Sequence, residues 1–517
     1  MGTATAHAPT GANSPSEPTV TVVVSIVISL LAYHLTAKLV PFLADDLVSK
    51  GLRGRDMLKP GFHRDKDVRA DNDDSDDNDL PGKRWIPEAT GVIGASVYIL
   101  LLSLFAPLPY LASLLSSSPN SSQYPYNSAS NPTLSLEGDL NFPHHSFATY
   151  LASLLSLLIA TFLGFCDDVF DIRWRFKLPI PLIASVPLLV TYAAGRGVTD
   201  VIIPDLFGLR RLLDITSTNG VLHLGWMYYL YMSMLSTFCT NSINILAGIN
   251  GVEVSQALII ALSLILNDLL YIPFRPSSLL SFVPPGVIAH VPARFIDAIA
   301  NSGTWSFGMN NGSQELQDRH LFSFYFMLPL VGVCFGLLKH NWYPARAFIG
   351  DTFCYFAGMS FAVTAILSHY SKTLLLFFVP QIFNFVYSGP QLFGFVPCPR
   401  HRLPRYDAKS DSLVPSWTLI KPPNLRTTRE RIGVSILVIA EQFRLVKLER
   451  NQDRQIIAST NLTILNLILL WRGARRTRED QLCRLMIAVQ VLGSVGAFFV
   501  RYGLGSWIYG GEGGNRR

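Results

Sequence analysis

The sequence predicts an all-α polytopic membrane protein with about ten transmembrane helices. Of its 517 residues, 49% are hydrophobic and only 15% are charged, whereas soluble domains carry about 25% charged residues. A helix needs roughly 20 apolar residues to cross the hydrocarbon core of a bilayer. Segments of about that length and character lie at 20–43, 90–114, 146–166, 178–195, 225–244, 252–274, 321–338, 352–369, 373–393 and 482–507.

These segments divide the chain into a membrane core and several loops. The tail before the first segment has no Lys or Arg, so that segment is expected to remain as an anchor and not to be cleaved as a signal peptide. A small cytosolic subdomain is expected before the last helix. The expected parts are a disordered far-side tail at 1–19, a transmembrane catalytic core at 20–399 with insertions at 62–84, 115–145 and 275–320, the cytosolic subdomain at 400–480, the last helix at 481–507 and a tail at 508–517.

Three stretches outside the spans differ in character. Residues 65–79 contain eight aspartates, which favours a disordered, solvated acidic loop over a cation site. Residues 275–320 are too polar to span and are expected to form a loosely ordered far-side loop. The hydrophobic alternation in 433–450 fits either a strand or a surface helix. The six cysteines have neither the spacing of a disulfide framework nor that of a zinc site.

Basic residues in the loops predict which side of the membrane each loop faces. Nine Lys and Arg residues lie between positions 44 and 89, none lies between 116 and 143, and 400–478 is again rich in both. Positive charge accumulates in cytosolic loops. The odd-numbered connections are therefore expected in the cytosol, with the N-terminal tail on the far side.

Paired acids end the third predicted span. Asp167 and Asp168 follow an apolar run, with Asp171 one helical turn further and Lys177 just beyond. Carboxylates beside hydrocarbon are costly, so acids at the membrane edge suggest a functional site. The alternative is a stop-transfer flank of solvated charges.

Amides fill the next cytosolic connection. The stretch FCTNSINILAGINGVE contains Asn241, Asn244 and Asn250 but no Lys or Arg. Amide oxygens are good ligands for hard cations, although Asn also bonds between membrane helices. Three asparagines within ten residues, on the same predicted membrane face as Asp167 and Asp168, favour a functional role.

Another acid and an aromatic residue stand at the start of the eighth predicted span. Asp351 could act simply as the N-cap of this helix. A helix N-terminus also favours phosphate, and the ring of Phe348 nearby could stack on a nucleobase.

A basic cluster follows the ninth predicted span. The stretch CPRHRLPR contains Arg400, His401, Arg402 and Arg405. Arginine binds phosphate through two parallel hydrogen bonds, so the cluster fits a diphosphate clamp. Positive-inside charge or attraction to lipid headgroups would also explain the arginines, but not the histidine.

All four clusters fall on the predicted cytosolic face. Acids and amides that hold Mg²⁺, together with arginines that hold phosphate, describe an active site for phosphoryl transfer, in which positioning and charge neutralisation dominate. A transporter would place its acids near the bilayer midplane, and a receptor or scaffold would give no reason for these clusters to share a face. The embedded position implies that one reactant is a lipid.

The chain resembles a known enzyme family in long, ordered motifs. LGFCDDVFDIRWRFKLPIP, FCTNSINILAGINGVE, HNWYPARAFIGDTFCYFAGMSFAV, PQIFNFVYS and PCPRHRLPR are similar to the eukaryotic UDP-N-acetylglucosamine–dolichyl-phosphate N-acetylglucosamine-1-phosphotransferases. This family belongs to the polyprenyl-phosphate hexosamine-1-phosphate transferase superfamily. The resemblance runs from about position 54 to 501, interrupted by the acidic loop and the two far-side insertions.

The resemblance implies an activity, a cofactor and a location. The expected enzyme is a multi-pass protein of the endoplasmic reticulum membrane, usually a homodimer, with its active site facing the cytosol. It would use Mg²⁺ to transfer N-acetylglucosamine-1-phosphate from UDP-N-acetylglucosamine to dolichyl phosphate, and nucleoside antibiotics of the tunicamycin type would inhibit it. The expected partners are these two substrates and the lipid bilayer, without nucleic acid.

The resemblance also implies roles for individual residues. The metal ligands would be Asn244 and Asp351, and Lys177 and Arg402 would contact phosphate, with Asp167 and Asp168 orienting Lys177 and the lipid phosphate or assisting proton removal. Phe348 would stack on uracil beside Asn250, and Arg400 and His401 would recognise the sugar. Near the lipid phosphate the resemblance places Lys59 and Glu88.

Overall fold

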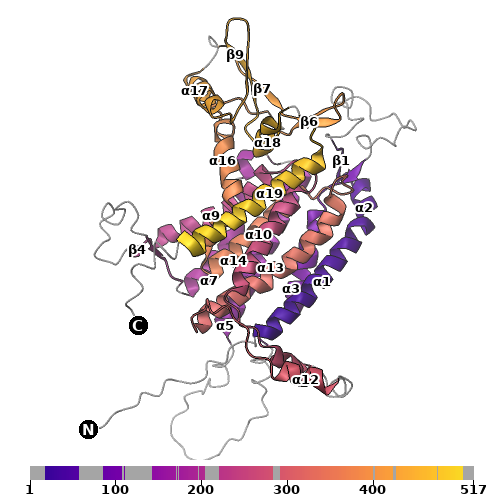
Figure 1. The fold of residues 1–517 in the computed structure, drawn as a ribbon, viewed down its shortest axis with the longest axis vertical. Coiled ribbons are helices and arrows are strands. Elements are labelled where there is room, and N and C mark those ends of the chain that lie inside the picture. Colours follow the sequence, from indigo (N-terminus) through magenta and orange to yellow (C-terminus); the bar gives the residue numbers. More distant parts are fainter. Residues whose placement is uncertain are drawn as a thin grey trace, which may run out of the picture.

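The computed structural model describes residues 18–56, 85–107, 110, 143–170, 172, 174–177, 179–195, 197–203, 221–282, 292–399, 402–422, 427–473 and 475–504. Each of the ten predicted spans contains a helix, and these helices form one bundle (Figure 1). They are α1 (Pro18–Phe42), α3 (Gly91–Phe105), α5 (His144–Phe170), α7 (Ile180–Ala194), α9 (Trp226–Ile245), α10 (Val252–Leu269), α13 (Gln314–Asn341), α14 (Gly350–Leu367), the pair α15 (Ser371–Phe377) and α16 (Val379–Leu392), and α19 (Glu479–Phe498).

Helix α14 is the centre of the bundle. Every residue from Thr352 to Ile366 is buried, and α14 packs against α5, α9, α13 and α3. Small residues permit the close approach of its neighbours. A Cβ at Gly164 of α5 would lie 2.9 Å from the Cα of Thr352, and a Cβ at Gly358 would overlap the backbone of Thr240 in α9. This packing holds the N-terminus of α14 firmly between its neighbours.

Six helices of the described chain are long and apolar enough to cross a membrane: α1, α5, α10, α13, α14 and α19 with the turn that follows it. The pair α15 and α16 would be a seventh, bent by 70° at Phe378. Helices α3 and α7 are apolar but have 15 residues each, or roughly 22 Å at 1.5 Å per residue. A multi-pass membrane protein is therefore clear, while the total of ten spans stays a prediction.

Two boundaries differ from the prediction. Helix α13 begins at Gln314 and not at 321, because Ser313 caps it by accepting a hydrogen bond from the Leu316 N–H. The polar segment before it is more ordered than expected. It contains the 3₁₀ helix η4 (Pro276–Phe282), the helix α12 (Ala293–Ala300) and a β-bridge between Phe274 and Trp305. The acidic stretch 65–79 lies outside the described residues.

Short elements border the ends of the bundle. Helix α2 (Ala44–Ser49) and strand β1 (Arg53–Gly54), which pairs with β2 (Ile86–Pro87), lie between α1 and α3. Helix α6 (Trp174–Lys177) follows α5, and β3 (Asp200–Ile202) pairs with β4 (Val221–His223) between α7 and α9.

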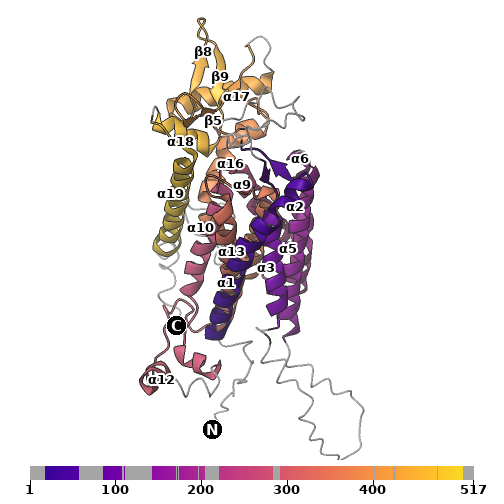
Figure 2. The same cartoon turned by 90° about the vertical axis from the view of Figure 1, so that its right-hand side faces the viewer.

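A small α/β unit stands beyond one end of the bundle, between α16 and α19 (Figures 1 and 2). The sequence of 433–450 fitted either a strand or a helix. The segment contains both, since a helix ends at Gln442 and a strand begins at Leu448. The elements of the unit are the hairpin β5 (Arg405–Asp407) and β6 (Ser412–Val414), the sheet β7 (Trp417–Leu419), β9 (Ile456–Thr460) and β8 (Leu448–Arg450), in that order, and the helices α17 (Thr428–Gln442) and α18 (Ile464–Arg472).

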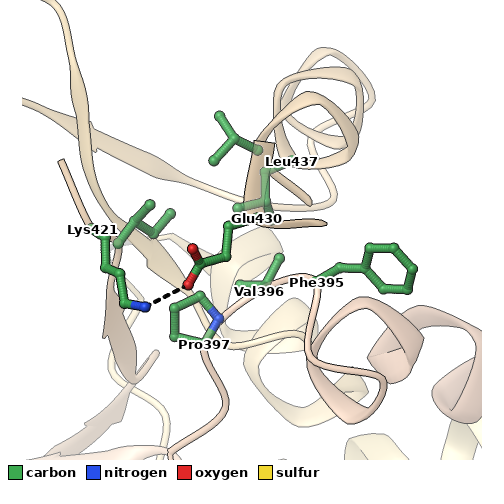
Figure 3. A pocket seen from close by; sticks show the side chains of 8 residues that line it. Phe395, Val396, Pro397, Lys421, Glu430 and Leu437 are labelled. Carbon is green, nitrogen blue, oxygen red and sulfur yellow. Dashed lines mark ion pairs between the residues drawn. The ribbon is translucent and has the colours of Figure 1, made fainter. Parts of the chain in front are cut away.

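The unit is joined to the ninth predicted span by a short buried link. Val396, just after α16, belongs to a cluster with Leu437 of α17 and Leu448 of β8. Figure 3 shows the small pocket at this link, where the Lys421 ammonium lies 2.8 Å from the Glu430 carboxylate. The link fixes α17 beside the end of α16.

A buried contact between an aspartate and a histidine lies near the opposite end of the bundle. The Asp268 carboxylate accepts a hydrogen bond from the Ser323 hydroxyl at 2.5 Å and lies 2.7 Å from Nδ1 of His320. The His320 ring stacks on Tyr271 with centroids 3.8 Å apart. Asp268 and His320 are 0% and 2% exposed, so the pair ties α10 to α13 away from water.

We expect Asp268→Ala to destabilise the protein by about 3–5 kcal/mol, because it leaves the buried His320 and Ser323 without their acceptor. Glu315→Ala, in the first turn of α13, is the matched control. It removes an exposed pair with Arg319, and such pairs contribute about 0–1 kcal/mol. Melting temperatures of the purified variants test this, and equal losses for the two would contradict it.

Candidate functional site

The predicted site residues that the structure describes gather where the C-termini of α5 and α9 meet the N-termini of α10 and α14. A pocket of about 250 Å³ opens at this end of the bundle, the end from which the α/β unit projects (Figure 2). Five of its lining residues, Glu88, Asn244, Asn250, Phe348 and Asp351, were predicted from the sequence as site residues. The others are Gly54, Arg55, Asp56, Ala247, Gly248, Ile249, Glu253, Asn341, Ile349, Gly350, Cys354, Leu403 and Glu479.

Asp168 caps helix α14 from the neighbouring helix α5. One of its carboxylate oxygens accepts the Asp351 N–H at 2.5 Å, and the other accepts the Thr352 N–H at 3.0 Å and the Thr352 hydroxyl. The hypothesis that Asp351 is the N-cap is wrong, because α14 begins at Gly350. A carboxylate satisfies the free N–H groups of a helix and its positive end together. Asp168 thus positions the chain segment that carries Asp351.

Glycine at position 350 makes this contact possible. Gly350 has a φ of +70°, and a Cβ there would overlap the Asp168 carboxylate. A side chain would therefore be strained by the backbone conformation and would also displace the cap.

Asp167, Lys177 and Asp351 form a charged triad beside the cap. The Lys177 ammonium lies 3.0 Å from Oδ1 of Asp167 and 2.5 Å from Oδ2 of Asp351. Burial lowers the pKa of Lys177, but the carboxylates of Asp351 and Asp167 outweigh burial and raise this pKa above its ordinary value. Lys177 is therefore a permanent cation at the mouth of the site.

One oxygen of the triad has no described partner. Oδ2 of Asp167 is buried and accepts no hydrogen bond within the described part of the chain, whereas Oδ1 also accepts the Ile172 N–H at 3.2 Å. The Asp167 side chain is 0% exposed and that of Asp351 is 26% exposed. Asp351 is thus the acid of the triad that faces the pocket.

Asn250 is held by two acids that lie far away in the sequence. Its backbone N–H donates to Glu479 of α19 at 2.6 Å, and its side-chain amide donates to Asp56 at 3.0 Å. Next to it, the Gly251 N–H donates to the side chain of Asn341 at 3.0 Å. These bonds fix the loop between α9 and α10. They use N–H donors of Asn250, so the side-chain oxygen of Asn250 is the atom that can accept a hydrogen bond.

Phe348 and Glu88 lie together at the opening. The backbone of Phe348 pairs with Pro87 and Thr90 through hydrogen bonds of 2.8 and 3.0 Å. A Cβ at Gly54 would lie 3.2 Å from the carboxylate of Glu88 and 3.3 Å from the ring of Phe348. Gly54 therefore leaves space next to an aromatic face and a carboxylate.

Arg402 lies just outside the pocket, next to Leu403, which lines it. Its carbonyl accepts the side-chain amide of Asn466 at 2.9 Å. Burial lowers the pKa of the Arg402 guanidinium, against a small opposing effect of Cys398. Its Nη1 is buried and has no hydrogen-bond partner among the described residues. A buried guanidinium nitrogen of this kind suits an anionic ligand.

The protein around the pocket can supply some, but not all, of the ligands of a hard divalent cation. Within the described ranges no three His, Cys, Asp or Glu side chains could jointly hold a metal. Asn244 and Asp351 line the same pocket and offer one amide and one carboxylate oxygen. Mg²⁺ commonly takes one or two protein ligands and completes its shell with water and substrate phosphates. The residues present therefore fit this ion together with a phosphorylated ligand.

Four residues singled out from the sequence cannot be compared with this geometry. Lys59, Asp171, Arg400 and His401 lie outside the described residues. Helix α5 ends at Phe170, one residue before the third acid of the paired-aspartate motif.

Sequence reasoning missed Asp56, Glu479 and Asn341 as parts of the site. Asp56 and Glu479 are 5% and 3% exposed, although both look like ordinary loop or first-turn acids in the sequence. Asn341 carried a weak signal, because its motif HNWYPARAFIGD also contains Phe348 and Asp351. No comparable signal singled out Asp56 or Glu479.

Comparison with known proteins gives one consistent result. The model of glycosyl transferase family 4 matches residues 150–369. The chain is 36% identical over 492 residues to the UDP-N-acetylglucosamine–dolichyl-phosphate N-acetylglucosaminephosphotransferase of Schizosaccharomyces pombe, covering 93% of this chain and 92% of the relative. The proteins of the same name from Saccharomyces cerevisiae and Dictyostelium discoideum are 34% and 36% identical, over 94% and 90% of this chain and 93% and 86% of theirs.

Proposed function

Because the chain belongs to the family of UDP-N-acetylglucosamine–dolichyl-phosphate N-acetylglucosaminephosphotransferases, we propose that the pocket at the α9–α10 and α14 termini is its active site. The enzyme transfers N-acetylglucosamine-1-phosphate from UDP-N-acetylglucosamine to dolichyl phosphate. It releases UMP and forms GlcNAc-diphosphodolichol, the first lipid intermediate of protein N-glycosylation. The observation that carries the site assignment is the convergence of Asn250, Phe348 and Asp351 on one pocket.

The nucleotide would occupy the part of the pocket between Phe348 and Asn250. The ring of Phe348 offers a face for uracil, and the amide of Asn250, held by Asp56 and Glu479, offers hydrogen bonds to uridine. A rigid amide loses little entropy on binding, so this preorganisation favours affinity. Arg400 and His401 would recognise the sugar.

The diphosphate would lie between the metal ligands and the basic residues. Asn244 and Asp351 would hold Mg²⁺, which when bound neutralises diphosphate charge. The buried Nη1 of Arg402 would donate to a phosphate oxygen, and Lys177 would attract the phosphate of the lipid. Lys59 and Glu88 would lie on this acceptor side.

The reaction would proceed in one in-line step. An oxygen of dolichyl phosphate attacks the β-phosphorus of UDP-N-acetylglucosamine while the bond to the UMP oxygen breaks. The acceptor is a phosphate monoester, which is largely ionised near neutral pH, so no strong base is required. Asp168 is a poor nucleophile for a two-step route, because hydrogen bonds to α14 engage both of its oxygens. Isolating a phospho-N-acetylglucosamine enzyme formed without lipid would refute the one-step mechanism.

The loop charges support a cytosolic orientation in the endoplasmic reticulum membrane. The described basic residues Lys50, Arg53 and Arg55 and those in the α/β unit share the side of the bundle that carries the pocket, as expected for cytosolic segments. In this proposal the protein has ten spans, counting α3, α7 and α9, and acts as a homodimer.

Measuring UMP release by the purified protein tests the proposal. UDP-N-acetylglucosamine with dolichyl phosphate and Mg²⁺ should release UMP, and omission of the lipid or chelation of the metal should abolish the signal. A tunicamycin-type inhibitor should compete with the nucleotide sugar. The second candidate is a transferase of the same class with other substrates. It would be favoured if UMP were released from UDP-N-acetylgalactosamine but not from UDP-N-acetylglucosamine, or with another polyprenyl phosphate but not with dolichyl phosphate.

We expect Glu479→Ala to raise the KM for UDP-N-acetylglucosamine by about tenfold with a smaller change in kcat. Asn250 would lose the acceptor of its N–H, and an unsatisfied buried donor costs about 1–3 kcal/mol. Asp480→Ala is the matched control, because Asp480 is in the same helical turn but pairs with Arg478 and Arg484 away from the pocket. Equal KM values for the two variants would contradict the role of Glu479.

A further inference from the structure

Helix α17 presents an apolar ridge that no described residue covers. Ile432, Ile436, Ile439 and Phe443 occupy positions i, i+4, i+7 and i+11, so they lie along one narrow stripe of the helix. Their side chains are 50%, 37%, 55% and 70% exposed. The buried residues of α17 are Gly433 and Leu437. The helix therefore exposes more large apolar side chains than it buries in the α/β unit.

The ridge lies beside the end of a membrane helix. Gly433 packs directly on the backbone of Phe395, since a Cβ at Gly433 would overlap the Phe395 carbonyl. Phe395 follows α16 by three residues, and the guanidinium of Arg429 lies 5.0 Å from the centre of its ring. Figures 1 and 2 show α17 beyond the end of α16, and Figure 3 shows Phe395 beneath the helix that carries Leu437.

Helix α16 also exposes apolar side chains. Val379, Phe383, Val386 and Phe393 occupy positions i, i+4, i+7 and i+14 along α16 and the residue after it, and they are 47%, 40%, 66% and 52% exposed. The pair α15–α16 is apolar enough to span a membrane, so in a bilayer this exposed face would meet lipid. Large apolar side chains are therefore exposed both on α16 and on α17, which lies beyond its end.

Basic residues flank the ridge. Arg429, Arg431 and Arg444 are exposed at its two ends. Trp471 of α18 is 63% exposed and donates its indole N–H to the Arg444 carbonyl at 2.9 Å. An apolar stripe bordered by arginine and tryptophan is typical of helices that lie in the headgroup layer, where anionic lipids attract basic side chains.

We propose that α17 is an interfacial membrane helix, whose apolar ridge lies in the headgroup layer beside α16 and whose arginines bind anionic lipid headgroups. The occupant is the bilayer surface and not a second protein, because α17 packs beside the end of a candidate membrane span and arginines border its ridge. The helix would hold the α/β unit, and with it the segment of Arg402, at a fixed height above the membrane.

A photocrosslinking amino acid tests this proposal on the full-length protein in lipid nanodiscs. p-Benzoylphenylalanine replaces Ile439 on the ridge, Val386 on α16 as the positive control, or Gln452 as the negative control. Gln452 is exposed at the turn between β8 and β9, the part of the unit farthest from the bundle in Figure 2. After illumination, intact-mass measurement identifies the adduct, and UMP release shows that each variant is folded.

The expected result is a phospholipid adduct at positions 439 and 386 and none at position 452. A variant at 439 that forms no lipid adduct while the one at 386 does would overturn the proposal. A crosslink from 439 to a second copy of the chain, or to any other protein, would also overturn it, because the ridge would then be a protein interface.

The charge part of the proposal has its own test. Phosphatidylserine in the nanodiscs should raise the adduct yield at position 439 by at least about fivefold over phosphatidylcholine alone, because even one basic residue near an anionic surface contributes roughly 1 kcal/mol. Arg429→Gln, Arg431→Gln and Arg444→Gln together should remove this difference while UMP release persists. A yield that is independent of phosphatidylserine in the unchanged protein would refute the role of the arginines.

Discussion

Asp351→Ala is expected to lower kcat by more than about tenfold, because it removes the only predicted carboxylate ligand of the metal and one partner of Lys177. Asp351 lies at the junction of the two halves of the site. Its carboxylate is 2.5 Å from the Lys177 ammonium, and it lines the pocket together with Asn244. Its loss would therefore affect the nucleotide side and the lipid side together.

Two measurements separate this effect from misfolding. Glu315→Ala, an exposed acid at the opposite end of the bundle, should leave turnover unchanged. Binding of Mn²⁺ in place of Mg²⁺, followed by electron paramagnetic resonance with UDP-N-acetylglucosamine present, should weaken in the Asp351 variant. Near-normal turnover of that variant at saturating Mg²⁺ would show that the metal assignment is wrong.

Gly350→Ala is expected to abolish most of the activity, although it adds a single methyl group. The backbone at this position has a φ of +70°, which costs a residue with a Cβ about 1 kcal/mol or more. The added methyl would also overlap the Asp168 carboxylate. The cap of α14 would open, and Asp351 would move relative to Lys177 and Asn244.

Gly496→Ala provides the matched control for this substitution. Gly496 lies inside α19, and a Cβ there would have open space around it. Alanine is also the better helix former, so this variant should keep full activity and stability. UMP release and melting temperature of the two variants should therefore diverge, and equal activities would contradict the role of the cap.

The helices of the bundle were largely predictable, because a membrane span is recorded locally in the sequence. About 20 apolar residues are needed to cross hydrocarbon, and each such run in this chain contains a helix. The bend of 70° between α15 and α16 was not predicted, although Pro380, in the first turn of α16, is a residue that often begins a new helix. The extension of α13 back to Gln314 was also missed, because its first turns are polar.

The site was predictable as a set of residues on one face, but not as a set of contacts. Loop charge and span order place Asp167, Asn250 and Asp351 on the same side without knowledge of the fold. The cap that Asp168 provides for α14 joins residues 183 positions apart, and the bond from Asn250 to Glu479 spans 229 positions. Neither pairing leaves a trace in local composition.

The sequence by itself therefore determined that this protein is a multi-pass membrane protein of the phosphotransferase family, with its predicted site residues at one end of the helices. Hydropathy, charge and ordered motifs are properties of short segments, so they can be recognised in the sequence without the fold. Only the tertiary structure decided that Asp168 is a cap, that Asp351 faces the pocket beside Lys177, and that Asp56 and Glu479 support Asn250. The physical reason is that a hydrogen bond depends on distances of about 3 Å between atoms, and packing alone brings distant parts of the chain that close.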